Sequence, residues 1–316
     1  MADPHGILLL DKPTGPTSHD LVARVRRAFR QRAVGHAGTL DPMASGLLVV
    51  AVGEGTKLVQ FLTHHDKVYD AEVSFGRSTD TLDGEGATVA EAPLPKEIAD
   101  QIAALGRGDA VDGPLRRALE AERMRLAQVP PSFAAIKQSG RPAYERARRG
   151  EAVLLAPRAV AVRDLTVLQN GASNVLAVRL SVSKGYYVRS FARDLGAAIG
   201  LPSYLSRLRR LHSGPFSIRD AVEFPASDER WAAALLDIAE AARRVLPTAT
   251  LTDEGLVFAR HGKPLGATHF HGTVPDATSA WFDGQGRLVA VGRFEASRQA
   301  LVVVRGFRYP TSSDVI

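Results

Sequence analysis

The segment from Gly35 to Leu48 constrains the fold of this chain more than any other. Its sequence is GHAGTLDPMASGLL, in which Gly38 and Pro42 lie on either side of a single carboxylate, Asp41. Glycine permits a sharp turn, proline fixes its own φ angle, and the apolar run that ends at Val52 is typical of a buried strand. An acid at such a bend is either the opener of an Asp-Pro turn or a nucleophile or general base.

Composition excludes several classes of protein. The chain has 316 residues, of which 45% are hydrophobic, and this is enough for one large domain and a small one. The absence of cysteine excludes disulfides, thiolate metal sites and cysteine nucleophiles. No apolar run approaches the roughly 20 residues of a membrane helix, and no basic segment precedes an apolar stretch at the N-terminus. We therefore expect a cytoplasmic protein without membrane contact.

Basic residues are concentrated in three segments. The net charge is +6, and 33 of the 40 basic residues are arginine, whose planar guanidinium suits phosphates and bases. Residues 21–38 contain five arginines and no acid, residues 139–163 contain six arginines and two glutamates, and residues 189–219 contain six arginines and one aspartate. Residues 66–112 contain eleven acids and four bases. Solvated helix faces would explain any one cluster, but the separation of charge predicts a nucleic-acid partner.

Apolar periodicity divides the chain into a larger α/β part and a smaller β part. Strands are expected at residues 7–10, 47–52, 69–75 and 176–182. Helices are expected at residues 17–29, 58–62, 94–105, 114–126, 142–149, 189–199 and 228–244. Short β runs at residues 279–282, 287–294 and 301–307 are joined by glycine turns. We therefore expect domains at residues 1–245 and 246–316.

Other candidate motifs lack residues that their chemistry needs. The sequence GEGTK at Gly53–Lys57 has too short a glycine spacing for a phosphate loop, and Leu58 occupies the Ser/Thr position. His269 and His271, with His261 nearby, have no acid or cysteine in the local sequence to complete a metal site. No dinucleotide fingerprint or serine elbow is present. The sequence therefore offers no motif for a metal site or a nucleotide cofactor.

Aromatic residues and one arginine accompany Asp41 as candidates for handling a base. Tyr69 lies at the start of a predicted strand, and Tyr186, Tyr187 and Arg189 follow another. Aromatic rings stack on unstacked bases, and an arginine can keep a buried carboxylate ionised or bind a phosphate. Each tyrosine alone is more often a core or interface residue. Together with Asp41 they favour acid chemistry on a nucleotide.

The Asp41 segment closely resembles the catalytic motif GHxGTLDPxAxG of the TruB family of pseudouridine synthases. Further similar motifs follow in the same order over residues 6–216: LLDKPTG at 9–15 with Thr17-Ser18, KVY at 67–69, TDTLDG at 79–84, QVPPSFAAIK at 128–137, SKGYYVRS at 183–190 and LRRL at 208–211. The resemblance implies an α/β (α+β) fold with a mixed, largely antiparallel sheet flanked by helices. It also implies a small C-terminal β-barrel of PUA-like type.

This resemblance implies isomerisation of uridine 55 in the T-loop of tRNA to pseudouridine, without a cofactor. The enzyme flips the nucleotide out of the folded loop. Asp41 matches the family's nucleophile, which attacks the sugar or the base or promotes formation of a glycal. By the same resemblance Tyr69 stacks on the uracil, and Arg189 pairs with Asp41 in a network that includes Asp83.

The resemblance also implies roles for residues around the pocket and on the RNA-binding face. His36 fills or supports the gap left by the flipped base, and Tyr187 and Leu208 line the pocket. An insertion at about residues 128–152 clamps the T-loop, with phosphate contacts from Arg146, Arg148 and Arg149. Departures from the family pattern are Phe133 and Ala134 in place of Tyr-Ser, Tyr186 in place of Thr, and a missing Phe-x-Gly before Gln128. We expect a monomer that binds the T-arm of tRNA without an obligate protein partner.

Two other functions are compatible with the same residues. An RNA chaperone would bind and refold tRNA without modifying it, and this role can coexist with catalysis. A guide-RNA-dependent synthase of the dyskerin type shares the catalytic motif. The short C-terminal part and the absence of a lysine-rich tail argue against the dyskerin type.

Overall fold

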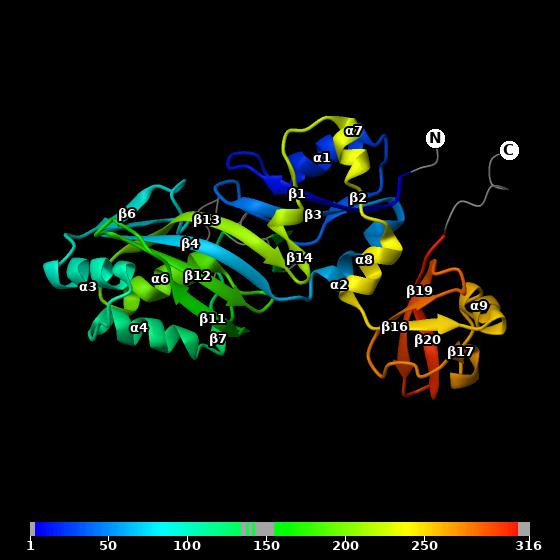
Figure 1. Cartoon of the computed structure of the whole chain (residues 1–316). Coiled ribbons are helices and arrows are strands. Elements are labelled where there is room, and N and C mark those ends of the chain that lie inside the picture. The colour runs from blue at the N-terminus through cyan, green and yellow to red at the C-terminus, as the bar shows by residue number, and fades with distance from the viewer. Residues whose placement is uncertain (1–3, 134–136, 139–140, 143–154, 309–316) are drawn as a thin grey trace.

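The computed structural model describes residues 4–133, 137–138, 141–142 and 155–308, and within them the strands form two main sheets (Figure 1). The larger sheet consists of β1 (Gly6–Lys12), β2 (Val34–His36), β3 (Ser45–Val52), β4 (Lys67–Phe75), β11 (Val162–Val167), β12 (Val175–Val182), β13 (Ser203–Ser213), β14 (Phe216–Ser217) and β15 (Val222–Glu223). The smaller sheet consists of β16 (Thr248–Leu251), β17 (Phe270–His271), β18 (Ser279–Phe282), β19 (Leu288–Glu295) and β20 (Ala300–Gly306).

Helices and short strand pairs accompany both sheets. Those before the smaller sheet are α1 (Ser18–Ala28), η1 (Gly53–Leu58), α2 (Val59–Leu62), α3 (Lys96–Arg107), α4 (Pro114–Arg123), α6 (Val188–Ala198), η2 (Ile218–Asp220), α7 (Asp228–Ala233) and α8 (Ile238–Val245). The smaller sheet is accompanied by α9 (Asp253–Arg260) and η3 (Ala267–His269). The short strands are β5 (Arg77–Thr79), β6 (Thr88–Glu91), β7 (Ala127–Gln128), β8 (Lys137–Gln138), β9 (Arg141–Pro142) and β10 (Arg158–Ala159). No helix in the described part of the chain is long and apolar enough to cross a membrane.

The larger sheet is mixed and largely antiparallel. Its strand order is β11-β12-β4-β13-β3-β1-β15, with β2 paired to β3 and β14 paired to β13. Strand β3 pairs in parallel with β13, and β1 pairs in parallel with β15, whereas the other described pairs of this sheet are antiparallel. The predicted fold class is therefore confirmed, and the five-stranded C-terminal sheet fits a PUA-like domain.

Helix α1 begins at a capping box. The Thr17 side chain accepts a hydrogen bond from the Asp20 backbone N–H, and the Asp20 carboxylate accepts one from the Thr17 backbone N–H. These bonds satisfy N–H groups that a helix start leaves unpaired. The buried side chains of α1 include Leu21, Val22 and Val25, and they pack against β1 and β3. The predicted helix start and its apolar face are both confirmed.

Strand β3 is buried on both faces. Alternate side chains contact two different clusters, because successive residues of a strand point to opposite faces. Leu48, Val50 and Val52 pack against α1, whereas the residues between them pack in a cluster that also contains side chains of α8 and of the C-terminal sheet, such as Phe282 and Leu288. The strand that follows Asp41 therefore packs against α1 on one face and against α8 and the C-terminal sheet on the other.

The helix expected at residues 228–244 is wrong, because two helices occupy this range. Helix α7 ends at Ala233, and Leu236 then forms an isolated bridge with Ile7, with N···O distances of 2.8 Å in both directions. The Asp237 side chain accepts hydrogen bonds from two backbone N–H groups at the start of α8. Pairing with the edge of β1 and a new N-cap therefore outweigh the helical propensity of this alanine-rich stretch.

Strand β13 is the longest strand in the described part of the chain, although the sequence pattern gives no prediction of it. Its eleven residues include Arg207 and Arg209, whose side chains are at least partly exposed and form ion pairs with neighbouring acids. Two register irregularities in its pairing with β4 also break the simple alternation. The apolar period of two that marks a strand is therefore weak in this segment.

Gly46 is required where β3 approaches β13. Its φ angle is +101°, and a Cβ atom at this position would lie 2.3 Å from the Arg210 carbonyl oxygen. Because both the conformation and the space exclude a side chain, we expect Gly46→Ala to lower the free energy of unfolding by roughly 2 kcal/mol or more. Urea denaturation measures this change.

Gly35→Ala is the matched control for this substitution. Gly35 lies in the same segment, but no atom is within 4 Å of the position that a Cβ would occupy there, and its φ is not positive. We expect a change of less than about 0.5 kcal/mol in the free energy of unfolding. Equal losses in the two variants would contradict the assignment of Gly46 to a close strand contact.

Candidate active site

The loop between β2 and β3 carries Asp41 and is attached to the start of α1. The Ser18 hydroxyl accepts a hydrogen bond from Leu40 N at 2.8 Å and lies 2.9 Å from the Leu40 carbonyl oxygen, to which it donates. On the other side of Asp41, the Pro42 carbonyl oxygen accepts a bond from Gly15 N at 2.9 Å. The residues adjacent to Asp41 are thus held by hydrogen bonds to other segments of the chain.

Lys12 holds this loop through hydrogen bonds to backbone carbonyl oxygens. Its side chain is fully buried at the end of β1, and its ammonium group donates to the carbonyl oxygens of Ala44 at 2.6 Å, Pro13 at 3.0 Å and Pro42 at 3.2 Å. Burial lowers the pKa of Lys12 to about 8, while the negative charge of Asp41 opposes this shift. Three acceptors use all three donors of the ammonium group.

Arg210 braces both ends of the same loop. It lies on β13 with 1% of its surface exposed, and its Nε donates to the Leu47 carbonyl oxygen at 2.7 Å. Its two terminal nitrogens donate to the carbonyl oxygens of Gly38 at 3.0 Å and Thr39 at 3.4 Å. In the described part of the chain this guanidinium has no carboxylate partner, so the loop carbonyls supply its hydrogen bonds.

Asp41 forms an ion pair with Arg189. The distance from Arg189 Nε to Asp41 Oδ2 is 2.9 Å, and the side chain of Arg189, in the first turn of α6, is 7% exposed. The remaining nitrogens of Arg189 donate to the carbonyl oxygens of Thr81 at 3.1 Å and Phe133 at 2.9 Å. Asp83 lies 3.7 Å from the same guanidinium. The hydrogen bonds to Thr81 and Phe133 therefore orient the Arg189 guanidinium so that its Nε faces Asp41.

The environment of Asp41 acts on its pKa in two directions. Although 35% of its side chain is exposed, surrounding protein atoms desolvate the carboxyl group and raise its pKa above the usual range. The charge of Arg189 opposes this rise, and the nearby charge of Asp83 adds to it. Arg189 is thus the main group that favours the ionised form of Asp41.

A cavity of about 290 Å³ opens at this ion pair. Its lining includes Asp41 and Arg189, with Tyr69 from β4, Leu208 from β13 and Tyr187 from the start of α6. The side chain of Gln128 fixes the backbone of Tyr187 by accepting from its N–H at 2.8 Å and donating to its carbonyl oxygen at 3.2 Å. Burial raises the pKa of Tyr187. Among the described residues, the lining therefore combines one acid with cations, aromatic rings and apolar side chains.

Residues 26–188 match the family described as TruB family pseudouridylate synthase, N-terminal domain. A protein of Syntrophotalea carbinolica called tRNA pseudouridine synthase B is 38% identical over 307 residues, which cover 93% of each chain. The chain belongs to the TruB family. Two further relatives have the same name. The protein from Thermobifida fusca is 38% identical over 97% of this chain and 100% of its own length. The protein from Gloeobacter violaceus is 45% identical over 70% of this chain and 72% of its own length.

Solved structures share the fold of this TruB-family chain. A chain in the crystal structure of a Cbf5–Nop10–Gar1 complex superposes with a TM-score of 0.68 at 23% identity, covering 96% of this chain and 84% of that chain. A chain in a structure of an H/ACA RNP bound to a substrate RNA that contains 2′-deoxyuridine superposes with a TM-score of 0.67, also at 23% identity, covering 96% and 85%. This likeness shows a common architecture.

Two of the residues predicted for the TruB-family site lie outside the cavity lining. His36 lies on β2, where its Nδ1 is buried and has no hydrogen-bond partner among the described residues. Burial, together with the charges of Arg210 and His19, lowers the pKa of His36. Asp83 is buried behind Arg189 and accepts a bond from the Thr81 hydroxyl at 2.6 Å. Asp83 thus contacts the site through Arg189.

Other predicted residues fall outside the described chain or have a different environment. Arg146, Arg148 and Arg149, with most of the expected insertion, lie outside the described residues. Tyr186 borders the cavity, but its hydroxyl donates to the buried Glu122 carboxylate at 2.6 Å. Among the described residues, no three His, Cys, Asp or Glu side chains are grouped as metal ligands would be.

The sequence pattern does not predict the buried cations of this TruB-family site. Lys12 and Arg210 lie within the LLDKPTG and LRRL motifs, and Lys67 is the first residue of the KVY motif, but none of these motifs indicates burial. Lys67 lines the cavity and donates to the carbonyl oxygens of His65 at 2.6 Å and Thr63 at 2.8 Å, while burial lowers its pKa to about 8. Lysine and arginine are usually exposed, so local sequence carries little signal of such positions.

Proposed function

We propose that this chain isomerises uridine 55 in the T-loop of tRNA to pseudouridine, with Asp41 as the nucleophile and without a cofactor. Nearly full-length relatives named tRNA pseudouridine synthase B support the reaction and the class of RNA. The observation that carries the proposal is the 2.9 Å ion pair between Asp41 and Arg189 at the cavity. Among the described residues it joins the single carboxylate that lines the cavity to a cation whose charge favours the ionised form.

The proposed reaction exchanges bonds within one nucleotide. The bond between uracil N1 and ribose C1′ breaks, the base turns, and a bond forms between C5 and C1′. The hydrogen at C5 is released as a proton and N1 gains a proton, so the reaction needs no oxidant and no energy source. Ionised Asp41 attacks C1′, attacks the base, or removes a ribose proton to give a glycal, and all three routes require a free carboxylate oxygen.

The cavity walls are suited to hold an extruded uracil. In this proposal Tyr69 stacks on the flipped base, and Tyr187 and Leu208 enclose it from the sides. Asp83 holds Arg189 in position from behind. His36, on the adjacent β2, supports the RNA at the position that the base leaves.

We further propose that the insertion at about residues 128–152 contacts T-loop phosphates through Arg146, Arg148 and Arg149. The catalytic domain would comprise residues 1–245 and the PUA-like domain residues 246–316, since α8 ends at Val245 and β16 begins at Thr248. In this proposal the protein acts in the cytoplasm as a monomer on tRNA alone.

Tritium release is the direct test of the proposed function. Purified protein, with no metal or nucleotide added, is expected to release tritium from C5-labelled uridine in a T-loop transcript. Chemical mapping of pseudouridine then identifies the modified position. Release without a modified position 55 would contradict the proposed site, and tight binding without release would favour the chaperone function.

A further inference from the structure

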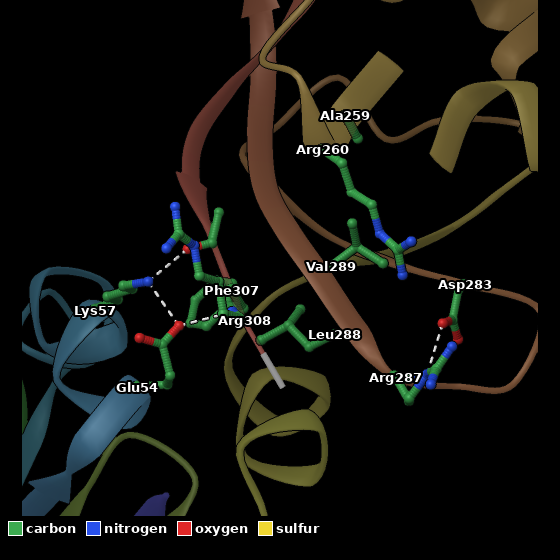
Figure 2. A pocket seen from close by; sticks show the side chains of 11 residues that line it. Glu54, Lys57, Ala259, Arg260, Asp283, Arg287, Leu288, Val289, Phe307 and Arg308 are labelled. Atoms are coloured by element: carbon green, nitrogen blue, oxygen red, sulfur yellow. Dashed lines mark hydrogen bonds and ion pairs between the residues drawn. The ribbon is translucent and has the colours of Figure 1, made fainter. Parts of the chain in front are cut away.

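A second cavity, of about 760 Å³, lies between η1 and the C-terminal sheet. Its lining residues are Glu54, Lys57, Ala259, Arg260, Asp283, Arg287, Leu288, Val289, Gly306, Phe307 and Arg308. None of them lines the Asp41 cavity. Figure 2 shows Lys57 and Arg308 on one side of Leu288 and Val289, and Arg260, Asp283 and Arg287 on the other. We call this space the η1 cavity.

The η1 cavity has an excess of positive charge. Four cations border it, and each of its two carboxylates already has partners (Figure 2). Glu54 accepts from Lys57 Nζ at 2.6 Å and from the backbone N–H of Arg308 at 2.7 Å. Asp283 accepts from Arg287 Nε at 2.8 Å. The side chains of Arg260 and Arg308 are therefore the groups of this cavity whose charge is uncompensated.

Arg260 and Arg308 are both exposed, and in the described part of the chain neither side chain forms an ion pair or a hydrogen bond. A guanidinium group presents parallel donors that match two oxygens of a phosphate. Two such groups lie on opposite sides of the buried Leu288 and Val289, so successive anionic groups of one extended ligand fit this cavity better than a single small anion. A nucleic-acid backbone carries such a series of phosphodiesters.

The position of the η1 cavity favours the same RNA that enters the Asp41 cavity. Lys57 of η1 borders one cavity, and Thr63, the residue that follows α2, borders the other. At a rise of 1.5–2 Å per residue, their backbones are roughly 10 Å apart. A small anion is too short to reach from one cavity to the other, whereas a polyanion chain is long enough to contact both.

We propose that the η1 cavity binds backbone phosphates of the RNA whose uridine enters the Asp41 cavity, one beside Arg308 and another beside Arg260. The identity of the RNA rests on the proposed function, whereas the phosphate contact rests on the geometry of this cavity. The contact adds affinity and orientation but takes no part in the chemistry at Asp41.

The test uses the full chain with Arg260→Gln and Arg308→Gln combined. Both side chains lack partners within the described part of the chain, so we expect an unchanged melting temperature. Binding of a full-length tRNA transcript should weaken about 10-fold at ~0.15 M salt, and the slope of log K against log salt should fall by about one to two. The kcat at saturating RNA should remain that of the wild type, with a higher KM.

Arg298→Gln is the matched control, because Arg298 lies in the turn between β19 and β20, at the end of that hairpin opposite Phe307, and is paired with Glu295. If the double variant binds RNA like this control, the proposal is overturned. A double variant that loses affinity for inorganic phosphate but keeps its RNA affinity would assign the cavity to a free anion and also overturn it.

The two proposals of this section and the preceding one fail separately. Weakened RNA binding by the double variant, in a protein that releases no tritium, would support the η1 cavity and remove the proposed reaction. Tritium release with unchanged binding by the double variant would support the reaction and remove the η1 cavity.

Discussion

Asp41→Asn is expected to abolish isomerisation while leaving RNA binding intact. Asparagine has nearly the same shape, and its side-chain oxygen can still accept a hydrogen bond from Arg189 Nε, which now lies 2.9 Å from the carboxylate. The amide, however, is a poor nucleophile and a poor base. Turnover should fall by about 10⁴-fold or more, the scale of losses on removing a group that acts directly in the chemistry. Single-turnover tritium release measures this loss.

Asp70→Asn is the matched control for the Asp41 variant. Asp70 lies on β4 beside Tyr69, and its carboxylate forms two hydrogen bonds with Arg179 outside the Asp41 cavity. We expect this variant to keep wild-type turnover within about twofold, because a surface ion pair contributes little to stability. Retained turnover by Asp41→Asn would remove Asp41 from the nucleophile role.

Arg189→Gln is expected to move the acid limb of the pH–rate profile to higher pH. The active form of Asp41 is ionised, so activity falls as the pH drops through its pKa in the folded protein. Burial already raises this pKa, and Arg189 opposes the rise. Without the guanidinium the pKa rises further, by about one unit or more, since an opposite charge at this distance shifts a carboxyl pKa by roughly 1–3 units.

Arg189→Lys and Arg193→Gln separate charge from positioning in that experiment. Lysine retains the charge but lacks the planar fork whose separate nitrogens reach Asp41, Thr81 and Phe133, so the acid limb should shift less while the plateau rate stays low. Arg193 lies one turn further along α6 and contacts Val129 and Asp194 instead. An equal shift of the acid limb in Arg193→Gln would contradict a specific effect of Arg189 on Asp41.

Local chemistry predicts the Asp41 segment well, because its features depend on adjacent residues. Gly38 and Gly46 have positive φ angles, and the apolar run ends in a strand buried on both faces, as the pattern indicates. The pairing of Asp41 with Arg189 is different, since it joins segments far apart in the chain. It is an expectation of the family resemblance, and the geometry brings the two side chains together.

The residues adjacent in sequence do not predict that the two cations Lys12 and Arg210 are buried. Lys12 and Arg210 have the residue types of solvated surface positions, yet each is buried among loop carbonyls that the fold assembles around it. Local sequence also fails to predict β13, because its charged residues interrupt the alternation of apolar and polar residues that marks a strand. It likewise fails to predict the break between α7 and α8. In each case a tertiary contact decides the local structure, and no adjacent residue indicates it.

The attachment of β15 and Leu236 to β1 has a consequence for the order in which the protein acquires activity. Leu10 of β1 pairs with Val222, and Ile7 pairs with Leu236, so one edge of the first strand stays open until the ribosome has made almost the whole larger sheet. Such distant pairings are slow to form, and an open edge favours wrong partners. Because Lys12 at the end of that strand donates to carbonyl oxygens of the Asp41 loop, we expect a competent catalytic loop to form only after β15, the last strand of the larger sheet, has paired with β1.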